Sequence, residues 1–292
     1  ARRLINEGET VVLKNCSAGS PLYCRLLLAK GLLELFLDEM QKSSTTAMTL
    51  ANSVSALSKE HPLKANFHTF REKLALTKGV ARPSALQTFD WALQVIAKTN
   101  GKTHPNYGRG QYDLASVFYQ QGKTNRAKEE LLKAKKLISA TVGRGAPTIA
   151  RIMSREAQML IDAKEYTAAE KTIKRAIYIS QRSLGSSAYY TLSLRSMLST
   201  VHRARGLNSD CANELEAIIG ISEKLLGPRH AVVLRYKIAL ATAWLELGLN
   251  NKAKQLLQAT IPLARHRFGL NHPLVGQAEH TYKSLSPRRR KK

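Results

Sequence analysis

The sequence of 292 residues predicts an all-α solenoid, that is, a stack of helical hairpins. The first observation is a ladder of glycines spaced 42 residues apart, at Gly101, Gly143, Gly185, Gly227 and Gly269. A second ladder, at 42 or 43 residues, marks the turn inside each hairpin and comprises Gly79, Gly122, Lys164, Gly206 and Gly248. Glycine suits both places because the C-terminal cap of a helix often takes a positive φ angle. Periods of this length are typical of solenoids.

The segment 104–138 shows what one repeat contains. One apolar stripe at helical spacing runs from Tyr112 to Tyr119, and a second runs from Ala127 to Ile138. Gly122 and the polar residues after it separate the two stripes. Each helix of such a pair has a single apolar face, so a hairpin needs neighbouring hairpins to bury it.

Small residues follow the same register, and they allow the two helices of a hairpin to cross closely. They are Ala115, Ala157, Ser199 and Ala241 on the first helices and Ala127, Ala169, Cys211 and Ala253 on the second. Proline is tolerated in the first turn of a helix, and the junctions carry His61-Pro62, His104-Pro105, Ala146-Pro147 and His272-Pro273. Because His61, His104, His230 and His272 share the junction, we expect them to cap or pack helices rather than to bind a metal.

Residues 1–19 do not carry the repeat. A short β-like run from Thr10 to Leu13 lies between Gly8 and Gly19. We therefore expect an extended N-terminal arm over 1–19.

The repeat resembles a known family. A glycine after a large apolar residue, a short link, His-Pro, a helix with a small residue and a Gln-Gly-Lys turn are similar to the 42-residue tetratricopeptide repeats (TPR) of the kinesin light chain type. This pattern is seen in Leu226–His230, Tyr119–Lys123 and Phe268–Pro273. The match is strong over 101–273, weaker over 61–100 and faint over 20–60.

The resemblance implies a right-handed α-solenoid of about six TPR-like hairpins over 20–285, flanked by the arm 1–19 and a basic tail 286–292. The hairpins are expected to begin near residues 20, 61, 104, 146, 188 and 230, and a capping helix is expected from about 273 to 285. The first hairpin could instead be a divergent cap, since the end units of solenoids are atypical.

The charge of the chain points to an anionic partner. Lysine and arginine total 46 against 21 acidic residues, which gives a net charge of +25. Such an excess favours nucleic acid or an anionic membrane surface, although a soluble protein can also be basic without such a partner. No apolar run reaches the roughly 18 residues that a membrane span needs. The three cysteines, Cys16, Cys24 and Cys211, have no metal-ligand spacing and indicate reduced thiols of an intracellular protein.

Catalytic motifs do not emerge from the sequence. Two Gly-Lys-Thr triplets, at 101–103 and 122–124, lack the earlier glycine of a phosphate-binding loop, because Ile96 and Val117 stand there. Gly108-Arg109-Gly110 lacks the third glycine and the preceding strand of a dinucleotide-binding motif. We expect no enzyme activity, no cofactor, no metal and no small-molecule ligand.

The C-terminal tail carries five consecutive cations, namely Arg288, Arg289, Arg290, Lys291 and Lys292. Because like charges repel until an anion covers them, an RNA-binding extension is one interpretation. A solvated tail without a partner and a nuclear import signal are the alternatives.

Two further sets of cations are candidate sites within the repeats. A basic stripe on the concave side, which the resemblance assigns to the first helices, comprises Arg109, Arg151 and Arg235, with Ser193 at the same register. A basic outer face on the second helices comprises Lys133, Lys135, Lys136, Lys174 and Arg175. For any single lysine, a solvated helix face is the alternative.

One departure from the family bears on function. Kinesin light chain repeats carry asparagines just before the Leu-Ala of the first helix, and these help to hold an extended peptide. The equivalent positions here are Tyr112 and Asp113, Ser154 and Arg155, Ser196 and Met197, and Ile238 and Ala239. Peptide binding in that manner is therefore not supported, although the scaffold is retained.

The sequence thus predicts a non-catalytic scaffold subunit of a large ribonucleoprotein, most specifically a mitochondrial ribosome, which binds neighbouring proteins and RNA phosphates. The mitochondrial matrix is favoured over the cytoplasm and the nucleus, because a start without methionine and with Arg2 and Arg3 would suit a processed protein. A peptide-binding adaptor of the kinesin light chain kind, cytoplasmic and without RNA, is the alternative. A regulatory sensor whose groove holds a peptide or a domain is a third.

Overall fold

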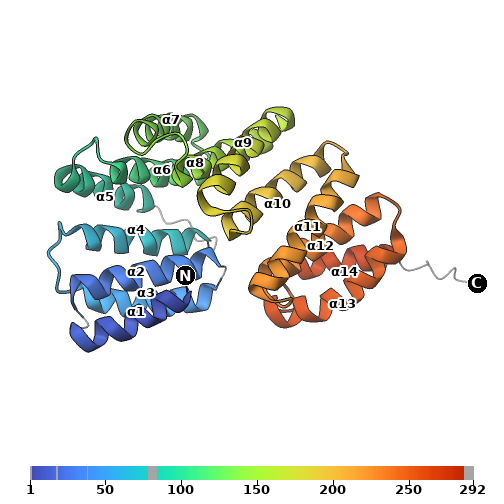
Figure 1. Cartoon of the computed structure of the whole chain (residues 1–292), viewed down its shortest axis with the longest axis horizontal. Helices are drawn as coiled ribbons and strands as arrows, with labels where there is room; N and C mark the ends of the chain where they lie inside the picture. Colours follow the sequence, from blue (N-terminus) through green and yellow to red (C-terminus); the bar gives the residue numbers. More distant parts are fainter. Residues whose placement is uncertain (1, 18, 38, 78–83, 286–292) are drawn as a thin grey trace, which may run out of the picture. The chain divides into compact units, whose positions relative to one another are not determined.

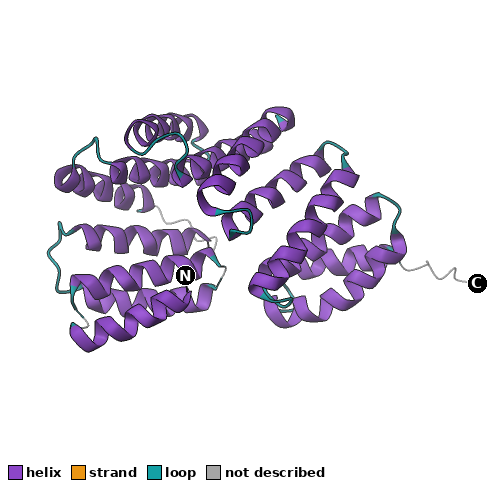
Figure 2. Cartoon of the chain, in the orientation of Figure 1, coloured by secondary structure: helices purple, strands orange, loops and turns teal. Residues whose placement is uncertain are grey.

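The computed structural model of the chain describes residues 2–17, 19–37, 39–77 and 84–285, and these form fourteen helices and no strand (Figures 1 and 2). The chain divides into two compact units, Ala1–Arg144 and Gly145–Lys292, within the range predicted as one solenoid. The helices of the first unit are α1 (Arg2–Asn15), α2 (Pro21–Phe36), α3 (Met40–Val54), α4 (Pro62–Thr77), α5 (Ala85–Asn100), α6 (Pro105–Gln120) and α7 (Thr124–Thr141). Those of the second are α8 (Pro147–Asp162), α9 (Tyr166–Leu184), α10 (Tyr189–Ala204), α11 (Asn208–Leu226), α12 (Ala231–Glu246), α13 (Asn250–Phe268) and α14 (Pro273–Ser284).

The six predicted hairpins are confirmed. Their first helices, α2, α4, α6, α8, α10 and α12, begin within one or two residues of the predicted starts, and α14 occupies the place of the capping helix. Within each unit a helix packs mainly against the helices next to it in sequence, which is the contact pattern of a solenoid. The segment 20–60, where the resemblance is faint, forms the complete hairpin α2–α3.

The expectation of an extended arm over residues 1–19 is wrong, because Arg2–Asn15 is the helix α1. Partly buried Ile5, Glu9 and Val12 recur at helical spacing, and Val12 packs against the apolar core of α2, α3 and α4. Glu9 forms an ion pair with Lys30 of α2 at 2.6 Å. The β-branched residues from Thr10 to Val12 suggested a strand, but docking on α2 overrides that local preference.

The small residues predicted at the crossing points are buried. Ala115, Ala157 and Ala241 on first helices and Ala127, Ala169 and Ala253 on second helices are all 0% exposed. Cys211 and Ser199 take the same places in the fifth hairpin and are also buried. The ladder of small residues therefore lets the two helices approach closely inside the third to sixth hairpins.

The junction histidines are helix caps, as predicted. The Nδ1 atoms of His61, His104, His230 and His272 each accept a hydrogen bond from the backbone N–H two residues later, at 3.1 to 3.3 Å. A side-chain acceptor at this place satisfies one of the N–H groups that the first turn of a helix leaves unpaired.

The turn inside the fourth hairpin departs from the glycine ladder. Lys164 has a φ of 61°, and it is the one residue other than glycine with a positive φ in the described part of the chain. Gly206, its equivalent in the next hairpin, has a φ of 76°. A side chain is strained in this left-handed conformation by about 1–2 kcal/mol, whereas glycine is not.

This strain predicts opposite effects at the two turns. Lys164→Gly should raise the free energy of unfolding by about 0.5–1 kcal/mol, and Gly206→Ala should lower it by about 1 kcal/mol. Urea denaturation followed by circular dichroism measures both. A loss of stability in Lys164→Gly would contradict the assignment of strain to this residue.

Candidate functional site

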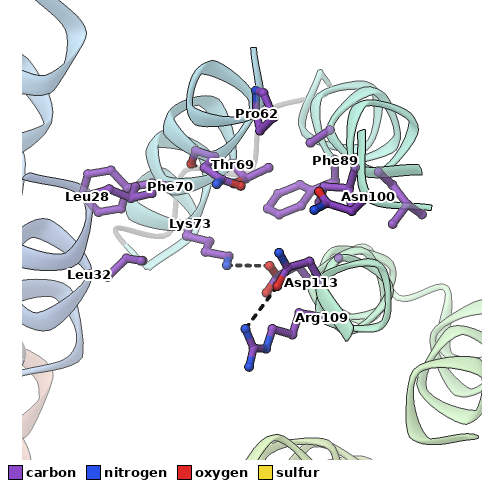
Figure 3. Close-up of a pocket in the computed structure, with 16 residues that line it drawn as sticks. Leu28, Leu32, Pro62, Thr69, Phe70, Lys73, Phe89, Asn100, Arg109 and Asp113 are labelled. Atoms are coloured by element: carbon purple, nitrogen blue, oxygen red, sulfur yellow. Dashed lines mark hydrogen bonds and ion pairs between the residues drawn. The ribbon is translucent and has the colours of Figure 1, made fainter. Parts of the chain in front are cut away.

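A pocket of about 300 Å³ lies in the first unit between α2, α4, α5 and α6 (Figure 3). Its apolar wall includes Leu28 of α2, Phe70 of α4 and Phe89 of α5. Its polar lining consists of Asn66, Thr69, Lys73, Asn100, Asn106, Arg109 and Asp113. The pocket therefore combines an apolar wall with amide and charged groups, as ligand-binding sites commonly do.

Two polar contacts organise the charged side of the pocket. Lys73 Nζ of α4 lies 2.7 Å from Asp113 Oδ2 of α6, and both side chains are partly exposed. Arg109 Nη1 donates a hydrogen bond to Asn106 Oδ1 at 3.2 Å. The lining contains two cations, Lys73 and Arg109. Lys73 is paired with Asp113, whereas Arg109 forms no ion pair among the described residues.

Glycines determine how closely the helices in and beside the pocket approach one another. A Cβ atom at Gly110 of α6 would lie 2.7 Å from Leu93 Cδ1 of α5, and one at Gly108 would lie 3.0 Å from Ile138 Cγ1 of α7. At Gly31 of α2 a Cβ would lie 2.5 Å from Phe70 Cζ. The two glycines around Arg109 are thus explained by helix packing, which accounts for the fragment of a dinucleotide motif.

The candidate basic stripe is divided between the two units. Arg109, Arg151 and Arg235 are each the fifth residue of a first helix, α6, α8 and α12, and all three are exposed. The Arg235 guanidinium carbon lies 5.9 Å from the centre of the Phe268 ring. Arg25, the fifth residue of α2, is also exposed, and it could not be predicted from the sequence because the family resemblance there is faint. That these arginines act together stays a prediction.

The candidate basic outer face is likewise found on two helices. On α7, Lys133 and Lys136 are exposed and Lys135 is partly buried. Lys135 and Lys136 border a shallow hollow of about 400 Å³ that Arg144 also lines. The hydrogen bond that Lys133 donates to Glu130, at 2.7 Å, raises the pKa of this lysine. On α9, Lys174 and Arg175 are exposed, and Lys174 forms an ion pair with Glu170 at 2.6 Å.

Known structures share this arrangement of helices. No protein-family model and no curated protein sequence matches the chain. The nearly identical TPR-like repeats of a kinesin light chain from Podosopora anserina match with 20% identity over 72% of this chain and 99% of that one, with a TM-score of 0.57. BtubC (BKLC) from P. vanneervenii matches with 17% identity over 86% and 94%, with a TM-score of 0.58.

The chain has the tetratricopeptide-repeat fold. A Rap protein complexed with competence and sporulation factor also shares it, with 14% identity over 97% of this chain and 78% of that one and a TM-score of 0.62. At these identities the likeness concerns the fold, so the chemistry must be argued from the side chains.

The polar groups of the TPR hairpins differ in position from the asparagines of kinesin light chains. Asp113 stands at one of the positions where the family resemblance expects asparagine, and it is paired with Lys73. The asparagines of the pocket lie elsewhere: Asn66 is the fifth residue of α4, Asn100 is the last residue of α5, and Asn106 is the second residue of α6. The positions at which kinesin light chain repeats carry asparagine therefore do not indicate this pocket.

The cysteines, the possible metal ligands and the Gly-Lys-Thr motif do not form a reactive site among the described residues. Cys24 and Cys211 are buried, and burial raises the pKa of both thiols. No group of three histidine, cysteine or acidic residues that could hold a metal occurs among the described residues. Gly122, in the second Gly-Lys-Thr triplet, has a φ of 74° in the turn between α6 and α7. None of the helices in the described part is long and apolar enough to cross a membrane.

The basic tail lies outside the described residues. Arg288, Arg289, Arg290, Lys291 and Lys292 all belong to the segment 286–292. Their role in RNA binding stays a prediction.

Proposed function

We propose that this TPR chain is a non-catalytic scaffold subunit of a large ribonucleoprotein, which binds neighbouring proteins through its helical faces and RNA phosphates through its basic surface. The observation that carries the proposal is the net charge of +25 on a solenoid. Even if every acidic residue paired with one cation, 25 lysine and arginine side chains would remain. Contacts to phosphates give affinity and position without reading the base sequence.

The exposed second helices support this proposal. Lys133 and Lys136 project from α7, which packs against α6. Lys174 and Arg175 project from α9, which packs against α8 and α10. Within the repeats, the exposed arginines on first helices, Arg109, Arg151 and Arg235, add charge on a second face. A scaffold with cations on several faces suits an assembly in which protein and RNA surround the chain.

The specific assembly that we propose is a mitochondrial ribosome, in the matrix. Cys24 and Cys211 are buried and form no disulfide among the described residues, which suits a reducing compartment. A ribosome also requires the phosphate contacts that a basic solenoid and the cationic segment 286–292 would provide.

A peptide-binding adaptor without RNA is the second candidate, and the pocket of the first unit favours it. An apolar wall with Phe70 and Phe89 beside Asn66, Asn106 and Arg109 could hold a peptide side chain or carboxylate. The pocket is confined to one unit and does not account for the charge of the rest of the chain. We therefore rank the peptide-binding adaptor below the ribonucleoprotein scaffold.

A filter-binding series tests the RNA proposal. If the five cations of the tail each contact a phosphate, the log–log salt slope of RNA binding should become less steep by about 3.5–4.5 when residues 286–292 are removed. Glutamine at positions 288–292 should have the same effect as truncation, which controls for chain length. Circular dichroism should show unchanged helix content.

Two results would contradict parts of this proposal. Equal slopes with and without the tail would exclude the tail as the phosphate contact. No retention of RNA by the full chain at low salt would contradict the ribonucleoprotein function and would favour the peptide-binding adaptor.

A further inference from the structure

The exposed face of α9 carries a row of cations around one aromatic ring. Lys171, Arg175, Tyr178 and Arg182 are spaced four, three and four residues apart, so they follow one another along the same side of the helix. All four are exposed, and so is Lys174 beside them. From residue 171 to residue 182 the row spans about 16 Å of the helix axis.

The ring of Tyr178 is held at the surface rather than buried. The residue is 57% exposed, although α9 packs against both α8 and α10. Arg182 Nη1 donates a hydrogen bond to Tyr178 Oη at 2.9 Å, and its guanidinium carbon lies 5.7 Å from the ring centre. This hydrogen bond also raises the pKa of Arg182. The arginine fixes the ring at its hydroxyl end and leaves much of it open to solvent.

The positive charge of this face is only partly neutralised. Glu170 is the acid next to it, and it pairs with Lys174 at 2.6 Å as well as with Arg205, while His202 lies 3.8 Å away. Lys171 and Arg175 form no ion pair within the described part of the chain. Because they are four residues apart on one helix, their like charges repel and an anion between them would be stabilising.

The repeat itself does not require this row. The helices α9, α11 and α13 begin 42 residues apart, at Tyr166, Asn208 and Asn250, so their positions correspond one to one. The positions matching 171, 174, 175, 178 and 182 are Asn213, Glu216, Ala217, Gly220 and Lys224 in α11 and Gln255, Gln258, Ala259, Pro262 and His266 in α13. Neither helix has an aromatic residue there, so packing of the solenoid does not explain the row on α9.

We propose that this face of α9 binds single-stranded RNA, with Lys171, Lys174 and Arg175 contacting phosphates and one base stacking on Tyr178. The inference rests on the proposed function, because it specifies where and in which form the chain binds RNA. Cations that follow the backbone beside an exposed aromatic ring are the elements with which proteins bind single strands. In a duplex the faces of the bases are covered by their neighbours, so Tyr178 could not stack on them.

The test compares single-stranded and duplex RNA of the same sequence by fluorescence anisotropy, using the full chain. Tyr178→Ala should weaken binding of the single strand about 5- to 150-fold. Tyr178→Phe loses the hydrogen bond from Arg182 but keeps the ring for stacking, so it should weaken binding much less than Tyr178→Ala. Lys171→Gln together with Arg175→Gln should make the salt slope less steep by about 1.4. Lys224→Gln, at the matching position of Arg182 on α11, is the control and should lower affinity much less than Arg182→Gln.

The possible results separate the two levels of the proposal. No binding of RNA by the unmodified chain at low salt would overturn both the RNA function and the site. Normal binding by Tyr178→Ala and by the Lys171→Gln, Arg175→Gln variant would overturn the α9 site alone. In a further outcome, the unmodified chain binds a polyglutamate peptide as tightly as RNA, and Tyr178→Ala binds both less tightly and to the same extent. That result would identify an acidic protein as the occupant of this face and would overturn the proposal that it binds RNA.

Discussion

Phe70→Ala should lower the free energy of unfolding by about 3–5 kcal/mol, the range for removing a large aromatic side chain from a packed core. Phe70 of α4 is 1% exposed and belongs to the apolar core formed with Tyr23, Cys24 and Leu27 of α2 and Leu50 of α3. It also forms part of the pocket wall, so its loss should enlarge the pocket as well. Chemical denaturation gives the stability change.

The close contact between Gly31 and Phe70 can be tested with a double-mutant cycle. A methyl group at Gly31 would lie 2.5 Å from Phe70 Cζ, so Gly31→Ala should be destabilising by about 1–3 kcal/mol through overpacking. In the Phe70→Ala background the same substitution should be much less harmful, because the clash is gone. Gly220→Ala in α11 is the control: its Cβ would meet nothing within 4 Å, and it should be stabilising by about 0.5–1 kcal/mol. Additive effects of Gly31→Ala and Phe70→Ala would contradict the contact.

Ala169→Leu should destabilise the second unit by about 1–3 kcal/mol or more, whereas Ala168→Leu should change stability by less than about 0.5 kcal/mol. The two alanines are neighbours on α9, but Ala169 is 0% exposed at the crossing with α8 and Ala168 is exposed. A leucine at 169 would have to displace the helix α8, while a leucine at 168 would extend into solvent.

Thermal and urea denaturation of the two variants provide the comparison. A similar loss of stability in both would mean that the small-residue ladder reflects composition rather than close helix crossing.

The hairpins could be predicted from the sequence because their boundaries are encoded locally. Gly185 and Gly227 end second helices with φ of 98° and 87°, and His104 and His230 begin first helices as caps. Such signals act within a few residues, so one chain suffices to read them. The helix α1 could not be predicted in this way, because its helical form depends on docking of Val12 and Glu9 on distant residues.

The candidate sites were predictable only in part. The exposure of Lys136, Lys174 and Arg175 follows from their place opposite the apolar stripe of a second helix. The pocket could not be foreseen, since it depends on tertiary approaches such as Gly110 to Leu93. Tyr178 was missed although its spacing from Arg182 was visible in the sequence, because only the structure shows that the ring is exposed.

Sedimentation of the native assembly tests the central claim most directly. Extracts of cells that express the full chain would be separated on a density gradient, with and without ribonuclease, and the chain would be detected by antibody. We predict that the chain migrates with a large RNA-containing particle and that ribonuclease shifts it to lighter fractions. Migration as a free protein or small protein complex under both conditions would contradict the claim that this TPR chain is a ribonucleoprotein scaffold.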